Sequence, residues 1–488
     1  MSKILAFDFG ASSGRAMLAQ YVDGKITMEE LHRFTNDPVF VNGTLFWDAL
    51  RLFYNIKQGI TKAVNAGGFD MIGIDTWGVD FGLIGEDGQL LENPVHYRDA
   101  RSDKPFEEFL NTVDTDEFYK TMGIQHVPIN TLYQLMALKK NHADLLARTK
   151  KILFTPDMYN YFLTGEMKAE YTIASTSEML DARKRDWSDE ALKLIGISRD
   201  KLCDITQPGS QCGFLSDEIC EELGAPKAKV MCTASHDTAA AVAAVPTQEK
   251  DYIFISCGTW SLLGTELQEA CINECGAKYN FANEGGVAGT YRFLQNIMGT
   301  WLIQESRRQW IREGSEHGFG ELEQMAKAAP QFASFIDVDN AEFGKPGNLP
   351  RRVREYCERT GQTAPKTQGE TIRCIDESLA MKFNYSILRL EECTGKQYET
   401  IHILGGGTKS ALLCQMTANA TGKRVVAGPD EATVLGNIAV QLIAAGEIKD
   451  IKEARRVIAS STELKTYEPQ DREQWKAQYE KFKSIIES

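Results

Sequence analysis

The hydrophobic and polar positions of the first forty residues form three short apolar runs separated by small polar stretches. The first run ends in Asp8, the stretch GASSGR (10–15) follows, and a second apolar run comes directly after it. The pair Asp23–Gly24 then separates the second run from the third, and such a pair is typical of a β-hairpin turn. We therefore predict that the chain begins with a three-stranded β-meander.

Helix-like and strand-like patterns alternate along the rest of the chain. The pattern predicts a helix over 47–66 that ends at Gly67 and Gly68. The other expected elements are two strands around TWGVD (76–80), mainly helices over 105–200 with interruptions at Pro128, Pro156 and Gly165, a strand and an alanine-rich helix around SHDT (235–238), a strand, a triple glycine, a helix and a strand over 399–429, and helices over 431–447 and 471–487.

The stretch 251–267 (DYIFISCGTWSLLGTEL) has the same order of features as the start of the chain: apolar strand, small polar turn with glycine, apolar strand. Gly10 and Gly258 lie 248 positions apart, about half of the 488 residues. This spacing indicates an internal duplication in which each half starts with a similar hairpin. Because hairpins rich in glycine and serine are common, these two stretches alone leave coincidence as an alternative.

Length and charge narrow the class of protein. A chain of 488 residues is expected to form two domains, because single domains rarely exceed about 250 residues. The net charge of −14 disfavours nucleic acid and anionic membranes as partners. No apolar run approaches the roughly 20 residues of a transmembrane helix, and Asp8 interrupts the first apolar run, unlike a signal peptide. We therefore expect a cytoplasmic protein.

The eleven cysteines include no CxxC pair, their number is odd, and histidines are few. This pattern argues against a zinc site and against the disulfide framework of a small secreted protein. Cys357 and Cys374 flank a polar segment that a disulfide between them would close. Two reduced thiols are the favoured state in a cytoplasm.

The two hairpins are the first candidates for phosphate binding. GASSGR lacks the spacing and the following helix of a P-loop, so it would hold phosphate through backbone N–H groups and the hydroxyls of Ser12 and Ser13, with Arg15 beside them. Thr259 and Ser261 offer hydroxyls in the second hairpin. Asp8 suits a magnesium ion held through water, and an ordinary carboxylate in a turn is the alternative.

Three further stretches carry candidate chemistry. Asp237 lies where a strand gives way to a helix, as a general base or as a helix N-cap. The triple glycine 405–407 permits close approach of a ligand or close packing. In TWGVD, Trp77 could stack on a sugar and Asp80 could accept bonds from hydroxyls, or both could belong to the core.

The order of these stretches resembles the FGGY carbohydrate kinases, within the superfamily of actin-like, sugar-kinase and chaperone ATPases. Within that family the chain is similar to the branch that phosphorylates L-rhamnulose. The matching stretches run from residue 8 to residue 437: DFGASSGR, GTLFWD, IGIDTWGVDF, NTLYQL, SHDTA, GTWSL, NEGG, NIMGTWL, HILGGG and AGPDEATVLGN.

The resemblance implies an α/β fold of two ribonuclease-H-like domains, here 1–244 and 245–488, with ATP and sugar in a central cleft. We expect the last helix to pack on the first domain. It implies transfer of phosphate from ATP to O1 of L-rhamnulose with Mg²⁺. On the matching positions it implies Asp237 as the proton acceptor; Gly78, His236, Thr238 and Asn296 around the sugar; Ala11, Ser12, Ser13, Gly14 and Arg15 around the phosphates; Thr259, Gln304 and Gly406 at the nucleotide; and Asp8 at the magnesium ion.

One position departs from the family pattern: Cys257 precedes Gly258 where a second serine is usual. The thiol keeps the size but loses a hydroxyl, and we expect it to make this loop sensitive to alkylation. The alternatives to an L-rhamnulose kinase are a kinase for another ketose or polyol, such as L-fuculose or L-xylulose, an actin-like or chaperone-like nucleotide switch, and a sugar-responsive repressor. The sequence leaves the oligomeric state open.

Overall fold

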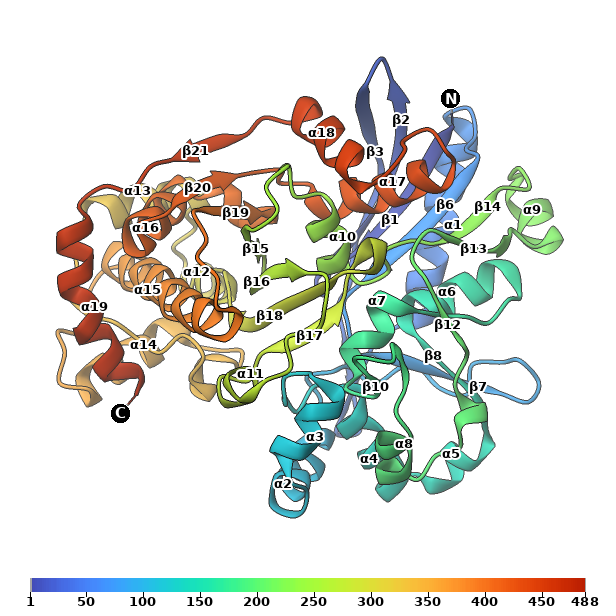
Figure 1. Ribbon diagram of the computed structural model, residues 1–488, viewed down its shortest axis with the longest axis horizontal. Coiled ribbons are helices and arrows are strands. Elements are labelled where there is room, and N and C mark those ends of the chain that lie inside the picture. Colours follow the sequence, from blue (N-terminus) through green and yellow to red (C-terminus); the bar gives the residue numbers. More distant parts are fainter. Residues whose placement is uncertain (1, 488) are drawn as a thin grey trace. The chain divides into compact units, whose positions relative to one another are not determined.

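The computed structural model describes residues 2–487, which divide into two compact units (Figure 1). Unit 1 contains the chain up to Gln248 together with 266–293 and 432–462. Unit 2 contains 249–265, 294–431 and the chain from Glu463 onward. The predicted division into 1–244 and 245–488 stays a prediction about sequence segments, because the compact units are not contiguous in sequence.

The first sheet has six strands in the order β13-β14-β6-β1-β2-β3. Its antiparallel part is the predicted meander of β1 (Lys3–Phe9), β2 (Ser13–Val22) and β3 (Lys25–Thr35). Asp23 and Gly24, with φ of 51° and 78°, form the predicted two-residue turn. Strands β6 (Met71–Thr76) and β14 (Lys229–Cys232) continue the sheet parallel to β1, and β13 (Ser210–Phe214) closes it.

The carboxyl ends of the parallel strands meet at one edge of this sheet. Asp8 on β1 is the register partner of Asp75 on β6. Thr76, the last residue of β6, donates its N–H to the carbonyl of Ser235 at 2.9 Å. Helix α10 (Asp237–Ala243) begins directly after this contact. The edge therefore brings the end of β1, the TWGVD stretch and the SHDT stretch together.

Helix α17 (Ala432–Ala444) covers β1 and β6 and packs on α10 (Figure 1). The two helices touch at Gly436, where an added Cβ would lie 1.8 Å from the carbonyl oxygen of Ala240. From α17, Asn437 donates to Oδ2 of Asp75 at 2.6 Å. A C-terminal helix thus supports the edge of the sheet that the N-terminal strands form.

The second sheet repeats this arrangement. Its strand order is β17-β18-β16-β15-β19-β20-β21, with β15 antiparallel to β16 and parallel to β19, and β19 parallel to β20. The order β18-β16-β15-β19-β20 thus matches β3-β2-β1-β6-β14, as the predicted duplication requires. The strands are β15 (Ile253–Cys257), β16 (Trp260–Leu267), β17 (Ala282–Gly285), β18 (Tyr291–Met298), β19 (Thr400–Leu404), β20 (Arg424–Ala427) and β21 (Lys465–Tyr467).

The last helix, α19 (Arg472–Ile486), packs within unit 2. It buries Trp475 and Phe482, two turns apart, against Phe332 and Phe335. Helix α19 therefore belongs to unit 2, and α17 and α18 are the C-terminal helices that join unit 1. The expectation that the last helix packs on the first domain stays a prediction. The other helices of unit 2 are α12 (Trp301–Arg312), α13 (Phe319–Ala328), α14 (Leu349–Arg359), α15 (Gln368–Thr394) and α16 (Ala411–Thr421).

The remaining elements of unit 1 lie outside the first sheet. The strands are β4 (Val39–Val41), β5 (Thr44–Phe46), β7 (Phe81–Gly85), β8 (Thr149–Phe154), β9 (Ala169–Glu170), β10 (Leu180–Asp181), β11 (Asp186–Trp187) and β12 (Ile205–Thr206). The helices are α1 (Ala49–Asn65), α2 (Asp103–Thr112), α3 (Thr115–Met122), α4 (Thr131–Asn141), α5 (Ala143–Arg148), α6 (Thr155–Thr164), α7 (Tyr171–Ala174), α8 (Asp189–Ile195), α9 (Asp217–Leu223), α11 (Glu274–Lys278) and α18 (Ile451–Ser461).

Most of the predicted elements of unit 1 are present. Helix α1 starts after the N-cap of Asp48 and ends before Gly67 and Gly68, which both have positive φ. Pro156 does not interrupt a helix as predicted: it lies in the first turn of α6, where its missing N–H leaves no bond unmade. Within residues 2–487, no helix combines the length and apolar character needed to cross a membrane.

Candidate functional site

The turn between β1 and β2 is held open by a side chain that the sequence analysis did not single out. Asn36, directly after β3, donates from Nδ2 to the carbonyl of Gly10 at 2.9 Å and from its N–H to the carbonyl of Ser12 at 3.0 Å. The N–H of Gly10 donates to the carbonyl of Ser13 at 2.9 Å. These bonds occupy the carbonyls of the turn, whose small side chains leave its backbone accessible to an anion.

Two carboxylates lie beside this turn. Oδ2 of Asp8 accepts from Nε and NH2 of Arg15 at 3.0 and 2.8 Å, so the predicted phosphate residue Arg15 is paired with the predicted metal residue. Asp75 is fully buried, and its Oδ1 has no hydrogen-bond partner among the residues that the structure describes. Burial and the neighbouring Asp8 carboxylate raise the pKa of Asp75 well above its usual range. Asp75 was not predicted from the sequence, although it lies near the end of a buried strand as Asp8 does.

Asp237 is the first residue of α10, and its two carboxylate oxygens differ. Oδ1 accepts from the N–H of Thr238 at 2.6 Å and from its hydroxyl at 3.3 Å, and Nε2 of His236 lies 3.2 Å away. Oδ2 makes no hydrogen bond within the described part of the chain. Burial raises the pKa of Asp237, the neighbouring His236 opposes this, and the Asp8 carboxylate adds to it. One oxygen is therefore anchored and the other is available to take a proton.

Gly78 and His236 lie side by side, as the prediction for the sugar site requires. A Cβ on Gly78 would be 3.3 Å from Nε2 of His236 and 3.2 Å from the side chain of Thr176. The next residue, Val79, has a positive φ of 66°, which is a strained conformation for a β-branched side chain. Its N–H donates to Oγ1 of Thr176 at 3.0 Å and its carbonyl accepts from Oγ1 of Thr131 at 2.7 Å. These bonds hold the turn at Gly78 in place.

The side chains of Trp77 and Asp80 belong to the core. Oδ2 of Asp80 accepts from the indole N–H groups of Trp47 and Trp77 at 2.6 and 2.9 Å, and Oδ1 accepts from Gln134 at 3.0 Å. Burial raises the pKa of Asp80 to about 6, against these hydrogen bonds. Both oxygens are occupied, so of the two interpretations of TWGVD the structure supports the core one. From this stretch, Gly78 lies beside His236.

Thr259 and Gln304, the residues predicted at the nucleotide, are linked through one short network in unit 2. Nε2 of Gln304 on α12 donates to Oγ1 of Thr300 at 3.0 Å, and this hydroxyl donates to the carbonyl of Gly258 at 2.7 Å. The carbonyl of Thr259 accepts from the N–H of Gly299 at 3.1 Å. The start of α12 is thereby tied to the second hairpin.

The triple glycine lies against the same hairpin. Gly405 has a φ of 75°, and a Cβ on Gly407 would lie 2.4 Å from Sγ of Cys257, whereas Gly406 has nothing closer than 4.0 Å. Cys257 is 1% exposed, and burial raises the pKa of its thiol to about 11. The expectation that this thiol makes the loop sensitive to alkylation is therefore wrong for the folded protein, because a buried protonated thiol is unreactive.

The structure separates the predicted site residues into two groups. Asp8, Ala11, Ser12, Ser13, Gly14, Arg15, Gly78, His236, Asp237 and Thr238 lie in unit 1, and Thr259, Asn296, Gln304 and Gly406 lie in unit 2. Residues 2–487 contain no cluster of three or more His, Cys, Asp or Glu side chains suited to a metal ion. Magnesium needs no such cage, because it commonly binds one or two carboxylates together with water and substrate phosphates. The orphaned Oδ1 of Asp75 beside Asp8 fits that requirement.

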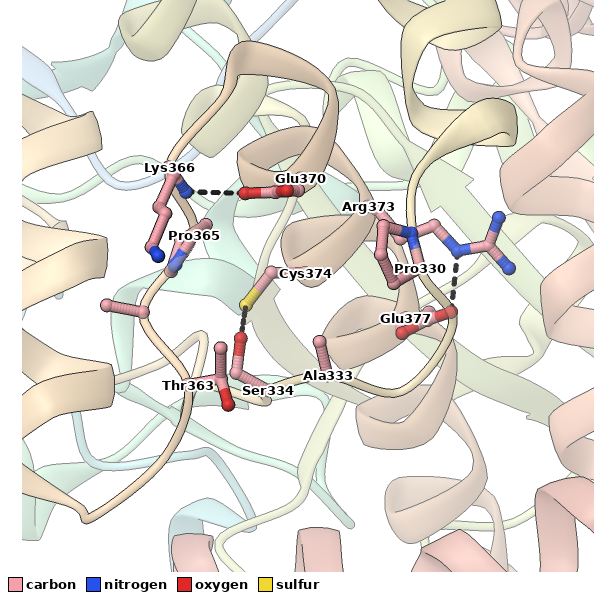
Figure 2. Close-up of a pocket in the computed structure, with 11 residues that line it drawn as sticks. Pro330, Ala333, Ser334, Thr363, Pro365, Lys366, Glu370, Arg373, Cys374 and Glu377 are labelled. Atoms are coloured by element: carbon pink, nitrogen blue, oxygen red, sulfur yellow. Dashed lines mark hydrogen bonds and ion pairs between the residues drawn. The ribbon is translucent and has the colours of Figure 1, made fainter.

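A pocket of about 210 Å³ in unit 2 contains none of the predicted site residues (Figure 2). The two carboxylates in this pocket already accept hydrogen bonds from neighbouring residues. Glu377 accepts from Nε of Arg373 at 2.7 Å, and Glu370 accepts from the backbone N–H of Lys366 at 2.6 Å. Cys374 lines the pocket, and its sulfur accepts from Oγ of Ser334 at 3.5 Å. Cys357 and Cys374 are both free thiols, as the sequence analysis favoured.

Two domains of one known protein family match most of the chain. Residues 3–244 match the N-terminal domain of the FGGY family of carbohydrate kinases, and residues 253–445 match its C-terminal domain. The chain is a member of this family. The predicted family and class of enzyme are thus confirmed, and kinases of this family use ATP and a sugar substrate.

Curated relatives span the full length of this kinase. It is 40% identical over 482 residues to a rhamnulokinase from Bacteroides thetaiotaomicron, with 99% of each chain covered. It is 39% identical over 468 residues to a rhamnulokinase from Bacillus subtilis, covering 96% of this chain and 95% of the relative.

Solved structures share the fold at low sequence identity. A xylulose kinase from Lactobacillus acidophilus matches with a TM-score of 0.81 at 17% identity, over 100% of this chain and 97% of that one. A Plasmodium falciparum glycerol kinase with ADP matches with a TM-score of 0.79 at 13% identity, over 100% and 98%. At such identities the likeness shows the two-domain fold, which was predicted.

Proposed function

We propose that this kinase transfers the γ-phosphoryl group of ATP to O1 of L-rhamnulose, giving L-rhamnulose 1-phosphate and ADP. The observation that carries the proposal is the asymmetric Asp237 carboxylate, with Oδ1 anchored and Oδ2 open, next to Gly78 and His236. The curated rhamnulokinases, about 40% identical over nearly the full chain, support L-rhamnulose as the sugar.

Asp237 would act as the general base. Oδ2 would accept the proton of the O1 hydroxyl as that oxygen attacks the γ-phosphorus, while the donors on Oδ1 keep the carboxylate in place. The raised pKa of Asp237 strengthens it as a proton acceptor at neutral pH. Gly78, His236, Thr238 and Asn296 would hold the sugar.

The phosphate chain of ATP would be held by backbone and charge. The turn from Ala11 to Arg15 would receive the γ-phosphate, and Thr259, Gln304 and Gly406 would contact the nucleotide. Asp8 and Asp75 would hold the magnesium ion through their oxygens and its water ligands. When bound, magnesium neutralises charge that develops on the phosphate oxygens.

The first test is magnesium-dependent release of ADP with L-rhamnulose, compared with L-fuculose, L-xylulose, D-xylulose and glycerol. We expect the highest kcat/KM with L-rhamnulose. A higher value with another sugar would refute the proposed substrate and leave the kinase chemistry. Turnover that no sugar stimulates would refute the whole proposal in favour of a nucleotide switch.

A further inference from the structure

Two charged side chains beside His236 are buried and belong to none of the predicted site residues. Arg292 on β18 is 0% exposed and Glu284 on β17 is 5% exposed. NH1 of Arg292 lies 3.0 Å from Oε2 of Glu284, and Nε of Arg292 donates to the carbonyl of Gly285 at 2.8 Å. The desolvation cost of a buried ion pair often exceeds its Coulombic gain, so stability alone is a weak reason for this pair.

The guanidinium also contacts the imidazole of His236. NH2 of Arg292 lies 3.1 Å from Nδ1 of His236. A guanidinium has only donors, so a hydrogen bond here requires Nδ1 to be the unprotonated, accepting nitrogen. A neutral imidazole of that form carries its proton on Nε2. Oε2 of Glu284 lies 3.3 Å from the same Nδ1, but within the described chain it forms no hydrogen bond.

The second ring nitrogen of His236, Nε2, lies next to the proposed base, Asp237. Nε2 of His236 lies 3.2 Å from Oδ1 of Asp237, close enough for a proton on Nε2 to attract the carboxylate, although the two atoms are not aligned as a hydrogen bond. The hydrogen-bond donors to Oδ1 are the N–H and the hydroxyl of Thr238, while Oδ2 accepts none from the described residues. A proton on Nδ1 instead would leave a lone pair on Nε2 facing a carboxylate, which is repulsive.

We propose that Arg292, held by its ion pair with Glu284, is a positioning residue that fixes the tautomer of His236. In this tautomer the Nε2 proton lies on the side of Oδ1 of Asp237 and attracts that oxygen, and Oδ2 remains the oxygen that takes the proton of the substrate. The last step rests on the proposed function, whereas the tautomer itself does not depend on the substrate. The contacts of Glu284 and Arg292 with His236 join residues that are distant in the sequence. No local sequence motif therefore predicts them.

The direct test is the protonation of the two ring nitrogens of His236 in the full-length protein. Two-bond ¹H–¹⁵N correlation spectra of protein labelled with ¹⁵N-histidine distinguish the two nitrogens, and His236→Gln identifies the signal among seven histidines. We expect a protonated Nε2 and an unprotonated Nδ1 at neutral pH. In Arg292→Met we expect the proton to move to Nδ1, facing Glu284. A wild-type spectrum with the proton on Nδ1 would overturn the proposal, and Arg292→Met is not needed for that result.

Kinetics separate positioning from general stability. Arg292→Met should lower kcat about tenfold or more with a much smaller change in the KM for ATP, because the base is present but misdirected. Arg292→Lys, which keeps the cation, should restore part of kcat. The matched control is Arg373→Met, which removes another buried arginine, paired with Glu377 at 2.7 Å in unit 2.

Each outcome of these experiments decides between the claims. We expect Arg373→Met to lower the urea midpoint but to keep kcat near the wild-type value. Equal losses of kcat in the two methionine variants, or an unchanged kcat in Arg292→Met, would refute the positioning role. If no sugar stimulates turnover of the wild-type protein, the proposed function fails, and the spectrum still decides the tautomer.

Discussion

Replacing Gly436 by alanine tests how closely α10 must pack on α17. In an ordinary helix interior this change stabilises a protein by about 0.5–1 kcal/mol, because glycine loses more backbone entropy on folding. Here the new Cβ would lie 1.8 Å from the carbonyl oxygen of Ala240, where about 3.4 Å is ordinary contact. The obstacle is backbone, so it cannot rotate away, and the helices must separate by more than 1 Å.

The expected cost follows from that separation. Overpacking of this kind costs about 1–3 kcal/mol, which exceeds the gain in helix propensity. Since α10 begins with Asp237, the shift also moves the proposed base, and a displacement of about 1 Å can cost about 100-fold in rate. We therefore expect Gly436→Ala to lower both the free energy of unfolding and kcat.

The measurement is urea unfolding followed by circular dichroism, together with steady-state release of ADP. Gly320→Ala is the matched control, because Gly320 is an exposed residue of α13 and an added Cβ there meets nothing within 4 Å. We expect this control to be neutral or stabilised by up to about 1 kcal/mol, with kcat unchanged. The reasoning fails if Gly436→Ala is as stable and as active as the control.

Three other predictions concern the site. Asp237→Asn should keep nucleotide binding, measured by ATP titration, and lower kcat about 100-fold or more; near-normal turnover would exclude Asp237 as the base. Because burial raises the pKa of Asp237 and a base works only when deprotonated, kcat should fall with decreasing pH at a higher pH than the usual aspartate pKa of about 3.9 allows. A pH profile of kcat checks this, and a profile that stays flat down to pH 4 would contradict it. Cys257 should react with iodoacetamide only after unfolding, which peptide mapping of native and urea-treated protein measures, and rapid native labelling would contradict its burial.

The sequence by itself determined the elements whose signals are local. The alternation of the first forty residues and the pair Asp23–Gly24 specify the meander, because side-chain period and turn chemistry act within a few residues. The order of short motifs identified the family. The repeated pattern of strand, glycine-containing turn and strand predicted an internal duplication, which agrees with two sheets of the same strand order. Asp8 and Asp237 became candidates for the same reason: each stands near the end of a strand or at the start of a helix.

Only the tertiary structure decided what lies next to these residues. Asp75 joins Asp8 through the parallel pairing of β1 and β6, and Arg292 reaches His236 from a strand more than fifty positions later. The same is true of Trp77, whose motif suits a sugar site but whose indole is bonded to Asp80 in the core. The position of a charged or aromatic residue in the sequence does not show which distant residue it will contact. Their roles depend on burial and on contacts between distant segments, and these exist only once the chain is folded.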